Sequence, residues 1–117
     1  MKYVEAYILP VKTAQMEEYQ IMAAKIAAIW IKLGALSVVE AKADHAPVGE
    51  LTSFPRAVLL EPDETVVFSY VTYRDRAHRN AVITLAMQDT EMMESLNFAG
   101  LDGKRMVWGG FEVIVAV

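Results

Sequence analysis

Residues 102–117 read D-G-K-R-M-V-W-G-G-F-E-V-I-V-A-V, and this stretch decides the fold. Its β-branched and aromatic residues favour a strand, and Asp102-Gly103 marks a turn just before it. The pair Gly109-Gly110 inside the pattern predicts a bulge or a close approach of another part of the chain. A strand this apolar would aggregate if it were left as an exposed edge. We therefore expect it to complete a sheet that other parts of the molecule cover.

Upstream, the spacing of apolar residues predicts three more strands and two helices. Alternating apolar residues indicate the strands, and apolar residues three or four positions apart indicate the helices. Thr13 and Asp75 are the expected N-caps, and Gly34 is the expected end of the first helix. In chain order we predict strand 3–9 ended by Pro10, helix 16–33, strand 35–43, strand 65–73, helix 76–87, a short helical turn at 89–95 and the closing strand.

One long segment, residues 44–63, has no clear element and contains Pro47, Gly49, Pro55 and Pro62. Irregular stretches of this length are uncommon in compact domains and are usually functional or mobile. Within it, the apolar run 57–60 is expected to add a short strand or to pack against the sheet.

The composition predicts one domain, residues 1–117, with more apolar surface than its own core needs. Apolar residues make up 55% of the chain, so we expect a homodimer. The net charge is −4 and the few clustered arginines are offset by Asp75, so we expect no nucleic-acid partner. The chain has no cysteine, which excludes disulfides and thiolate sites.

Two features argue against export and membrane insertion. Glu5 and Pro10 break any apolar leader sequence near residue 1. Lys25 and Lys32 interrupt the longest apolar helical stretch, 21–36, so no membrane span is expected. The expected location is the cytoplasm.

Two β-α-β units separated by a loop predict an α+β fold of the ferredoxin-like βαββαβ type. Right-handed crossovers place both helices on one face of an antiparallel four-stranded sheet. The other face then needs cover, and a second copy in a two-fold dimer supplies it. We assign Tyr3, Tyr7 and Trp108 to this dimer interface. By alternation, the same uncovered face is expected to carry Tyr3, Glu5, Tyr7, Glu40, Val67, Ser69, Val71 and Trp108.

Several motifs resemble the YbaA-like bacterial family of unknown function. They are G-A-L-x-V-V-E at 34–40, D-x-x-P-x-G-E-x-T-x-F at 44–54, E-x-V-V-F-S-Y at 64–70 and D-G-K-R-M-x-x-G-G-F at 102–111. The resemblance runs nearly end to end, and the last motif is the most specific. It implies a dimeric α/β-barrel. The wider superfamily includes cofactor-independent monooxygenases, haem-degrading enzymes and small-molecule-binding domains, so the resemblance implies fold more strongly than function.

The candidate pocket residues from the sequence are Glu40, Asp44, His45, Arg56 and Trp108. His45 beside Asp44 could act as an oriented general base, or as a weak metal site with Glu40. The alternative is a solvated loop pair in which Asp44 caps a turn. Because the pattern is short and unspecific, we expect no metal site and no bound cofactor.

The other candidates also have structural alternatives. Glu40 could be an acid or base in a pocket, or an ion-pair partner at a dimer rim. Arg56 could bind an anion through a bidentate fork, or form a surface salt bridge. Trp108 beside the two glycines could stack on a flat ligand, or anchor the dimer.

Two functions remain open from the sequence. The first is a homodimeric barrel that binds, or also transforms, a small organic molecule without a cofactor. The second is a non-enzymatic homodimeric module for interaction or regulation. The sequence does not decide whether the protein is an enzyme.

Overall fold

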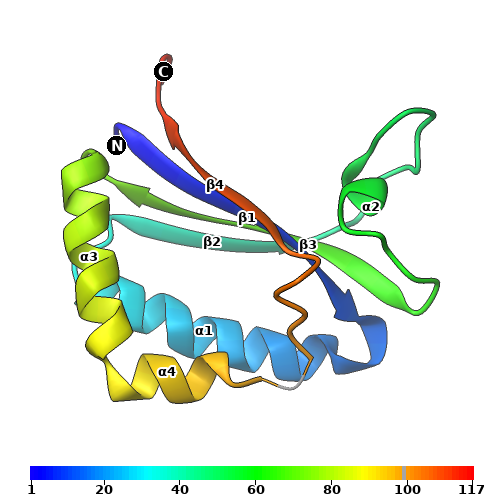
Figure 1. The fold of residues 1–117 in the computed structure, drawn as a ribbon, viewed down its shortest axis with the longest axis horizontal. Coiled ribbons are helices and arrows are strands. Elements are labelled where there is room, and N and C mark those ends of the chain that lie inside the picture. The colour runs from blue at the N-terminus through cyan, green and yellow to red at the C-terminus, as the bar shows by residue number, and fades with distance from the viewer. Residues whose placement is uncertain (99) are drawn as a thin grey trace.

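The computed structural model describes residues 1–98 and 100–117, and it has helices on one side of a single sheet (Figure 1). Helices α1, α3 and α4 form one layer, while α2 lies apart at one end of the sheet. The elements in chain order are β1 (Tyr3–Lys12), η1 (Thr13–Gln15), α1 (Met16–Lys32), β2 (Ser37–Lys42), α2 (Phe54–Ala57), β3 (Glu64–Tyr73), α3 (Arg76–Gln88), α4 (Thr90–Leu96) and β4 (Val107–Glu112).

The sheet has the order β2-β3-β1-β4, and each neighbouring pair is antiparallel. The central pair runs from Tyr3 opposite Tyr73 to Lys12 opposite Glu64. The α+β class and the antiparallel four-stranded sheet with helices on one face are therefore confirmed. No helix among residues 1–98 and 100–117 is long and apolar enough to cross a bilayer.

Strand β1 does not end at Pro10, as the sequence predicted, but continues to Lys12. Proline is tolerated there because pairing with β4 stops at Ile8, so β1 has only β3 as a neighbour beyond that point. A missing backbone N–H costs little where a strand has one free side.

The closing strand is shorter than predicted, and its glycines do not form a bulge. Pairing of β4 with β1 is continuous from Val107 to Glu112, without an extra residue. The expected close approach is present, because a Cβ added at Gly110 would lie 2.0 Å from the hydroxyl oxygen of Tyr3. One further hydrogen bond joins the Val113 N–H to the Lys2 carbonyl, and the chain then leaves the sheet.

Of the four α-helices among the described residues, α2, α3 and α4 begin with a side-chain cap, and Ser53 caps α2 by accepting from the Arg56 N–H. The Asp75 carboxylate accepts from the His78 N–H and caps α3, as predicted, and Asp89 caps α4 in the same way. Thr13 is not the cap of α1, because a 3-10 turn (η1) precedes this helix. Its hydroxyl instead bonds that of Thr65 at 2.8 Å, which links the turn to β3.

The prediction of which sheet face is uncovered was wrong. Tyr3, Tyr7 and Val71 pack with buried residues of the helix layer, so the odd-numbered side chains of β1 and β3 face the helices. Alternation then places the even-numbered side chains of β1 and β3 on the face without the helix layer (Figure 1). The register of the sheet adds the odd-numbered side chains of β2 and β4 to the same face. This uncovered face is largely apolar and includes Val4, Ala6, Ile8, Val39, Phe68, Tyr70, Val107 and Phe111, and the hydrogen-bonded pair Ser37 and Thr72 also lies on it.

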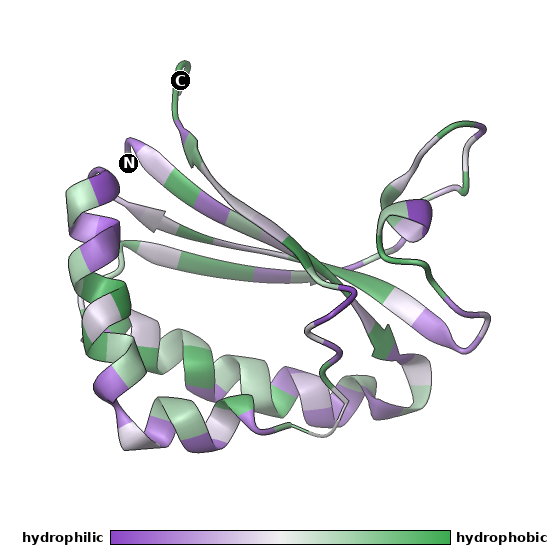
Figure 2. Ribbon diagram, viewed as in Figure 1, coloured by the Kyte–Doolittle hydropathy of each residue, from purple (hydrophilic) through white to green (hydrophobic). Residues whose placement is uncertain are grey.

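The core lies between the two layers and is divided into clusters. One cluster joins β1 and β3 to the first half of α1, and another joins α1 to α3 and α4 through Ile29, Ala86 and Met92. In Figure 2 the helices show both hydrophobic and hydrophilic stretches, as expected for helices with one buried side. The segment 44–63 crosses to the uncovered face, where the rings of Phe54 and Phe68 meet edge to face at 6.4 Å. Within its 57–60 run, Val58 is fully buried, so this run packs down.

Candidate functional site

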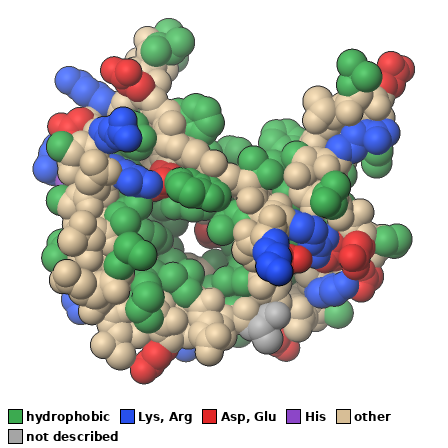
Figure 3. All heavy atoms as spheres, in the orientation of Figure 1, with side chains coloured by type: hydrophobic (Ala, Val, Ile, Leu, Met, Phe, Trp, Pro, Cys, Tyr) green, Lys and Arg blue, Asp and Glu red, His purple; other side chains and the backbone are tan. Residues whose placement is uncertain are grey.

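A cavity of about 560 Å³ lies between the sheet and the helix layer. Figure 3 shows the corresponding opening in the molecule, surrounded mainly by hydrophobic side chains. Its walls come from β1, β2, β3, α1 and the segment that connects α4 to β4. The lining residues are Tyr7, Leu9, Tyr19, Met22, Ala23, Ile26, Trp30, Val38, Glu40, Ser69, Val71, Leu96, Asn97, Phe98, Leu101, Asp102, Gly103 and Met106.

The sequence builds this cavity from two regular patterns. The α1 side chains that line it recur at helical spacing, from Tyr19 through Met22 and Ile26 to Trp30. The strand side chains that line it occupy alternate positions, such as Ser69 and Val71 on β3. When the apolar side of a helix faces a strand, the side chains of the two elements normally fill the space between them. Here α4 and residues 97, 98 and 101–106 complete the enclosure and leave room for a ligand.

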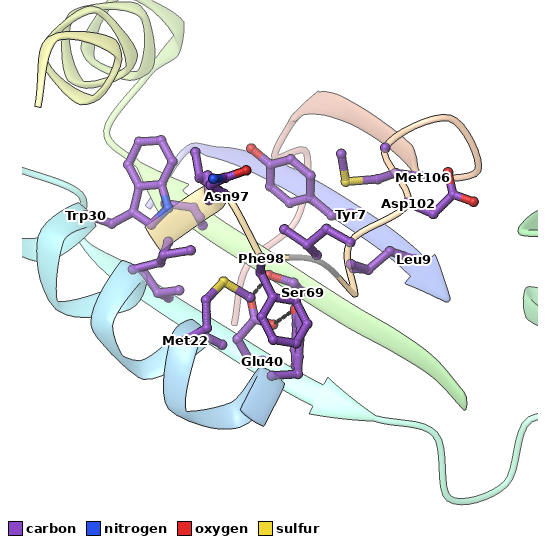
Figure 4. Close-up of a pocket in the computed structure, with 18 residues that line it drawn as sticks. Tyr7, Leu9, Met22, Trp30, Glu40, Ser69, Asn97, Phe98, Asp102 and Met106 are labelled. Atoms are coloured by element: carbon purple, nitrogen blue, oxygen red, sulfur yellow. Dashed lines mark hydrogen bonds between the residues drawn. The ribbon is translucent and has the colours of Figure 1, made fainter. Parts of the chain in front are cut away.

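The polar centre of the cavity is the carboxylate of Glu40 on the edge strand β2 (Figure 4). The Tyr19 hydroxyl donates to one carboxylate oxygen at 2.5 Å, and the Ser69 hydroxyl donates to the other. These bonds cross from β2 to both α1 and β3, so the position of the carboxylate is fixed by three elements. A carboxylate has about four acceptor sites, which leaves capacity for a further donor.

Tyr19 acts as a donor in this cluster. Burial, followed by its hydrogen bond to Glu40, raises the pKa of the Tyr19 hydroxyl well above its usual range. The phenol therefore remains protonated at every pH at which the protein is expected to be folded. Its contact with Phe98, edge to face at 6.3 Å, holds the ring against the segment that closes the cavity.

The wall formed by residues 97, 98 and 101–106 is anchored through Arg105. Its guanidinium donates to both oxygens of Glu64, at 2.7 and 2.6 Å, and to Asp102 at 2.8 Å. It also donates to the Leu59 carbonyl at 3.1 Å. Arg105 lowers the pKa of Glu64 to about 2. The network joins the cavity wall to β3 and to the 44–63 segment, so its role is structural.

A second polar group lies at the Tyr7 side of the cavity. Glu5 is only 1% exposed, and the Arg79 guanidinium of α3 donates to both of its oxygens. Burial, and then the charge of Glu5, raises the pKa of the Tyr7 hydroxyl above its usual range. The Glu5–Arg79 pair fixes α3 over β1.

Of the five predicted pocket residues, only Glu40 lines this cavity. His45 borders a separate hollow of about 310 Å³ beneath the 44–63 segment, and Asp44 is exposed nearby. Arg56 donates to the carbonyls of Val48 and Gly49 and so holds that segment together. Trp108 is 60% exposed on β4. These four side chains are not brought together with Glu40.

The dimer-interface prediction also needs a change of residues. Tyr3 and Tyr7 face the helix layer, and Trp108 is paired with Tyr7, so its side chain belongs to the same face. A dimer formed through the uncovered face would instead contact the even-numbered side chains of β1. The original assignment failed because alternation separates two faces but does not say which one the helices cover.

No cluster of three or more His, Asp or Glu side chains suited to a metal ion occurs in the described part of the chain. The residues that sequence reasoning missed are Tyr19 and Ser69, together with Asn97 and Phe98 in the wall. Tyr19 lies in the helix predicted at 16–33, where its ring fits the apolar spacing of that helix. Its hydroxyl was the available signal, because a phenol on a buried stripe needs an acceptor, and Glu40 supplies one.

Comparison with known proteins places the chain among relatives without an assigned activity. A family model described as "Protein of unknown function (DUF1428)" matches residues 2–103. The "Uncharacterized protein YbaA" of Escherichia coli strain K12 is 40% identical over 115 residues, which cover 98% of each chain. Proteins of the same name from Escherichia coli O157:H7 and Shigella flexneri match to the same extent. The chain therefore belongs to the DUF1428 family of proteins of unknown function.

Proposed function

We propose that the protein binds a small, largely apolar organic molecule in the cavity between its sheet and its helices. The observation that carries the proposal is a cavity of about 560 Å³ with apolar walls and one fixed polar group, Glu40. Ligand pockets are typically of this size and combine hydrophobic walls with a few placed polar groups. The sequence prediction located the pocket in the interior of a dimeric barrel. The geometry supports a pocket within each protomer instead.

The arrangement supports binding more directly than catalysis. An activated nucleophile needs a base that is itself oriented by a third group. The Ser69 hydroxyl donates to one oxygen of Glu40 and the Tyr19 hydroxyl donates to the other, so both hydroxyls serve to fix the carboxylate in place. We therefore propose a binding function.

We also propose that two copies form a dimer through the uncovered sheet face, in a ferredoxin-like dimeric α/β-barrel. The order β2-β3-β1-β4 supports the ferredoxin-like part. The dimer is supported by the apolar side chains of the uncovered face, including Phe111, which is 59% exposed. Exposed apolar patches of this kind commonly mark interaction sites.

Two apolar segments at the ends of the sheet support the same dimer. Leu51, in the 44–63 segment, is 96% exposed, and Ile114, beyond β4, is 91% exposed. Both segments project away from the helix layer (Figure 1), so they would flank a second copy placed on the uncovered face. The second candidate function, a homodimeric interaction module, rests on this surface alone and does not require the cavity.

The binding proposal is tested with Ala23→Phe, which directs a large side chain into the cavity. Ala23 is buried on α1 and lines the cavity, whereas its neighbour Ala24 is exposed. Ala24→Phe is therefore the matched control. We expect small molecules that raise the melting temperature of the wild-type protein and of Ala24→Phe to have no effect on Ala23→Phe.

The measurement is a thermal-shift screen with a library of small organic molecules, followed by calorimetry on the compounds that stabilise the protein. Circular dichroism confirms that both variants fold. Ligands that stabilise all three proteins equally would bind elsewhere and would contradict the proposal. A library without any stabilising compound would favour the interaction module.

A further inference from the structure

The charged groups of the cavity define which ligands it can accept, and this inference rests on the proposed binding function. We infer that the cavity selects neutral or cationic molecules with an amine or hydroxyl donor for Glu40, and that it rejects anions. Among the described lining residues, the charged side chains are Glu40 and Asp102, and none is lysine, arginine or histidine. An anion would therefore enter a site with negative charge and no cation to pair with.

Glu40 is the carboxylate that remains open to a ligand. Each of its oxygens accepts one hydrogen bond, from Tyr19 and from Ser69 respectively. These donors are neutral, so the charge of Glu40 is not cancelled by a neighbouring cation in the cavity. Because a carboxylate oxygen can accept a second bond, an amine or hydroxyl of the ligand can complete the set. Hydrogen bonds to an ionised acceptor are roughly twice as strong as those between neutral groups.

Asp102 is less suited to this role, because its charge is already paired with the guanidinium of Arg105. One accepts from Arg105 at 2.8 Å and the other from the Lys104 N–H at 3.1 Å. Arg105, which lies in the same segment as Asp102, is itself held by Glu64 through two further bonds. Binding an anion there would require breaking this network.

The aromatic side chains around the cavity add to the same preference. Tyr7, Tyr19, Trp30 and Phe98 all line it. The faces of aromatic rings attract cations and offer no compensation to an anion. The remaining walls are apolar, and moving an unpaired charge into such surroundings is costly.

Glu40 also lies at the border of the cavity. It lines a second hollow of about 350 Å³ between α1 and β2, together with Tyr19, Ala23, Val38 and the cationic Lys42, which does not line the main cavity. Glu40 is exposed, so water reaches it from this side. A ligand donor can thus bind the inner side of the carboxylate without removing all of its hydration, which lowers the cost of burying the charge.

The experiment uses two matched triads of probes. One is phenethylamine, 2-phenylethanol and phenylacetate, and the other is tryptamine, tryptophol and indole-3-acetate. Within a triad the aromatic skeleton is the same, and only the charge and donor capacity of the terminal group change. Calorimetry or ligand-observed NMR at pH 7 gives the dissociation constants for wild-type protein. We expect each amine to bind at least about tenfold more tightly than its acid, with the alcohol between them.

Glu40→Gln removes the charge and keeps the size of the side chain. It is expected to reduce the preference for amine over acid to about threefold or less. Glu17→Gln is the matched control, because Glu17 is exposed in the first turn of α1 and does not line the cavity. The control should keep the full preference.

Each outcome decides a different point. If no probe in either triad binds the wild-type protein, the proposed binding function itself fails. If probes bind but the acids bind as tightly as the amines, the cavity binds ligands and the charge selectivity is wrong. If the amine preference persists undiminished in Glu40→Gln, the assignment to Glu40 is overturned. The same measurements on Ala23→Phe, in which the new side chain fills the cavity, should show no binding of any probe. This result would place the probes in this cavity.

Discussion

At the scale of single residues, Glu64 joins three parts of the chain. It is buried at the start of β3, accepts two bonds from Arg105 and accepts one from the Glu61 N–H. Arg105 and the backbone donor lower its pKa to about 2, although burial opposes the shift. The carboxyl of an unfolded chain has a pKa of about 4.3. Because the folded-state value is lower, Glu64 stabilises the native state above about pH 4.3 and loses this contribution as the pH falls toward about 2.

The first prediction concerns Glu64→Gln. The variant should unfold roughly 5 °C below the wild-type protein at pH 6, and this difference should shrink steadily between about pH 4.3 and about pH 2. Thermal unfolding followed by circular dichroism over this range checks it. Glu17→Gln, at an exposed site, should show neither effect. A difference that stays constant down to pH 2 would mean that Glu64 stabilises the fold through packing and not through its charge.

The second residue-scale prediction concerns the close approach at Gly110. A Cβ there would lie 2.0 Å from the Tyr3 oxygen and 2.7 Å from its ring, so Gly110→Ala should destabilise the protein by about 1–3 kcal/mol. At Gly103 the added Cβ would meet nothing within 4 Å, so Gly103→Ala serves as the control. Urea unfolding gives the values. If the clash with the Tyr3 ring is the cause, Gly110→Ala should lower the free energy of unfolding much less in a Tyr3→Ala background than in the wild-type protein.

At the scale of elements, the buried pair Glu5–Arg79 fixes α3 to the central strand. Breaking one partner of a buried ion pair is costly because the other charge is left unpaired. Arg79→Met should therefore lower the free energy of unfolding by about 3 kcal/mol. The double variant Glu5→Gln, Arg79→Met should recover much of this loss, since it removes the stranded charge as well.

The control for this pair is Arg76→Met, at an exposed position of the same helix. It should change the stability by less than about 0.5 kcal/mol. Chemical unfolding of the wild-type protein, Glu5→Gln, Arg79→Met and the double variant forms a double-variant cycle. Equal losses for the single and the double variant would show that the pair does not couple α3 to β1.

Most elements could be predicted from the sequence because their periodicity is local. The helix at Met16–Lys32 and the strand at Glu64–Tyr73 lie within a residue or two of the predicted bounds. The orientation of the sheet could not be predicted in this way. On β1 the more polar set, with Glu5, faces inward because Arg79 and the cavity receive it. Arg79 lies more than seventy residues from Glu5 in the sequence, and the cavity depends on the space between the sheet and the helices. No local sequence pattern encodes either of them.

At the scale of the whole molecule, the uncovered face of the sheet predicts assembly. We expect light scattering of the wild-type protein to give twice the 13.0 kDa mass of one chain. Phe111→Glu would place a charge within the desolvated interface, on the edge strand β4, and should give monomers at micromolar concentration. Met87→Glu is the control, since Met87 is equally exposed on α3 but belongs to the helix layer. A wild-type monomer would contradict the proposed dimer.

The candidate site was only partly within reach of sequence reasoning. Glu40 was identified because a carboxylate on a predicted strand required a partner. His45 and Arg56 were selected for their chemistry alone, and the structure gives them positions on the 44–63 segment away from the cavity. The cavity itself depends on how far α1 and α4 stand from the sheet, a distance set by side chains such as Trp30 and Phe98 that are far apart in the sequence.

The alternation of β1 has an evolutionary consequence. Tyr7 and Leu9 line the cavity, while Ala6 and Ile8 between them lie on the opposite face. Under the proposed binding function and the proposed dimer, consecutive residues of this strand would be exposed to two separate selective pressures, ligand choice and self-association. A lineage could change its ligand through odd-numbered positions while it keeps its assembly, or lose the assembly through even-numbered positions while it keeps its ligand. Sequence variation along this strand should accordingly show a period of two, with each set of positions varying independently of the other.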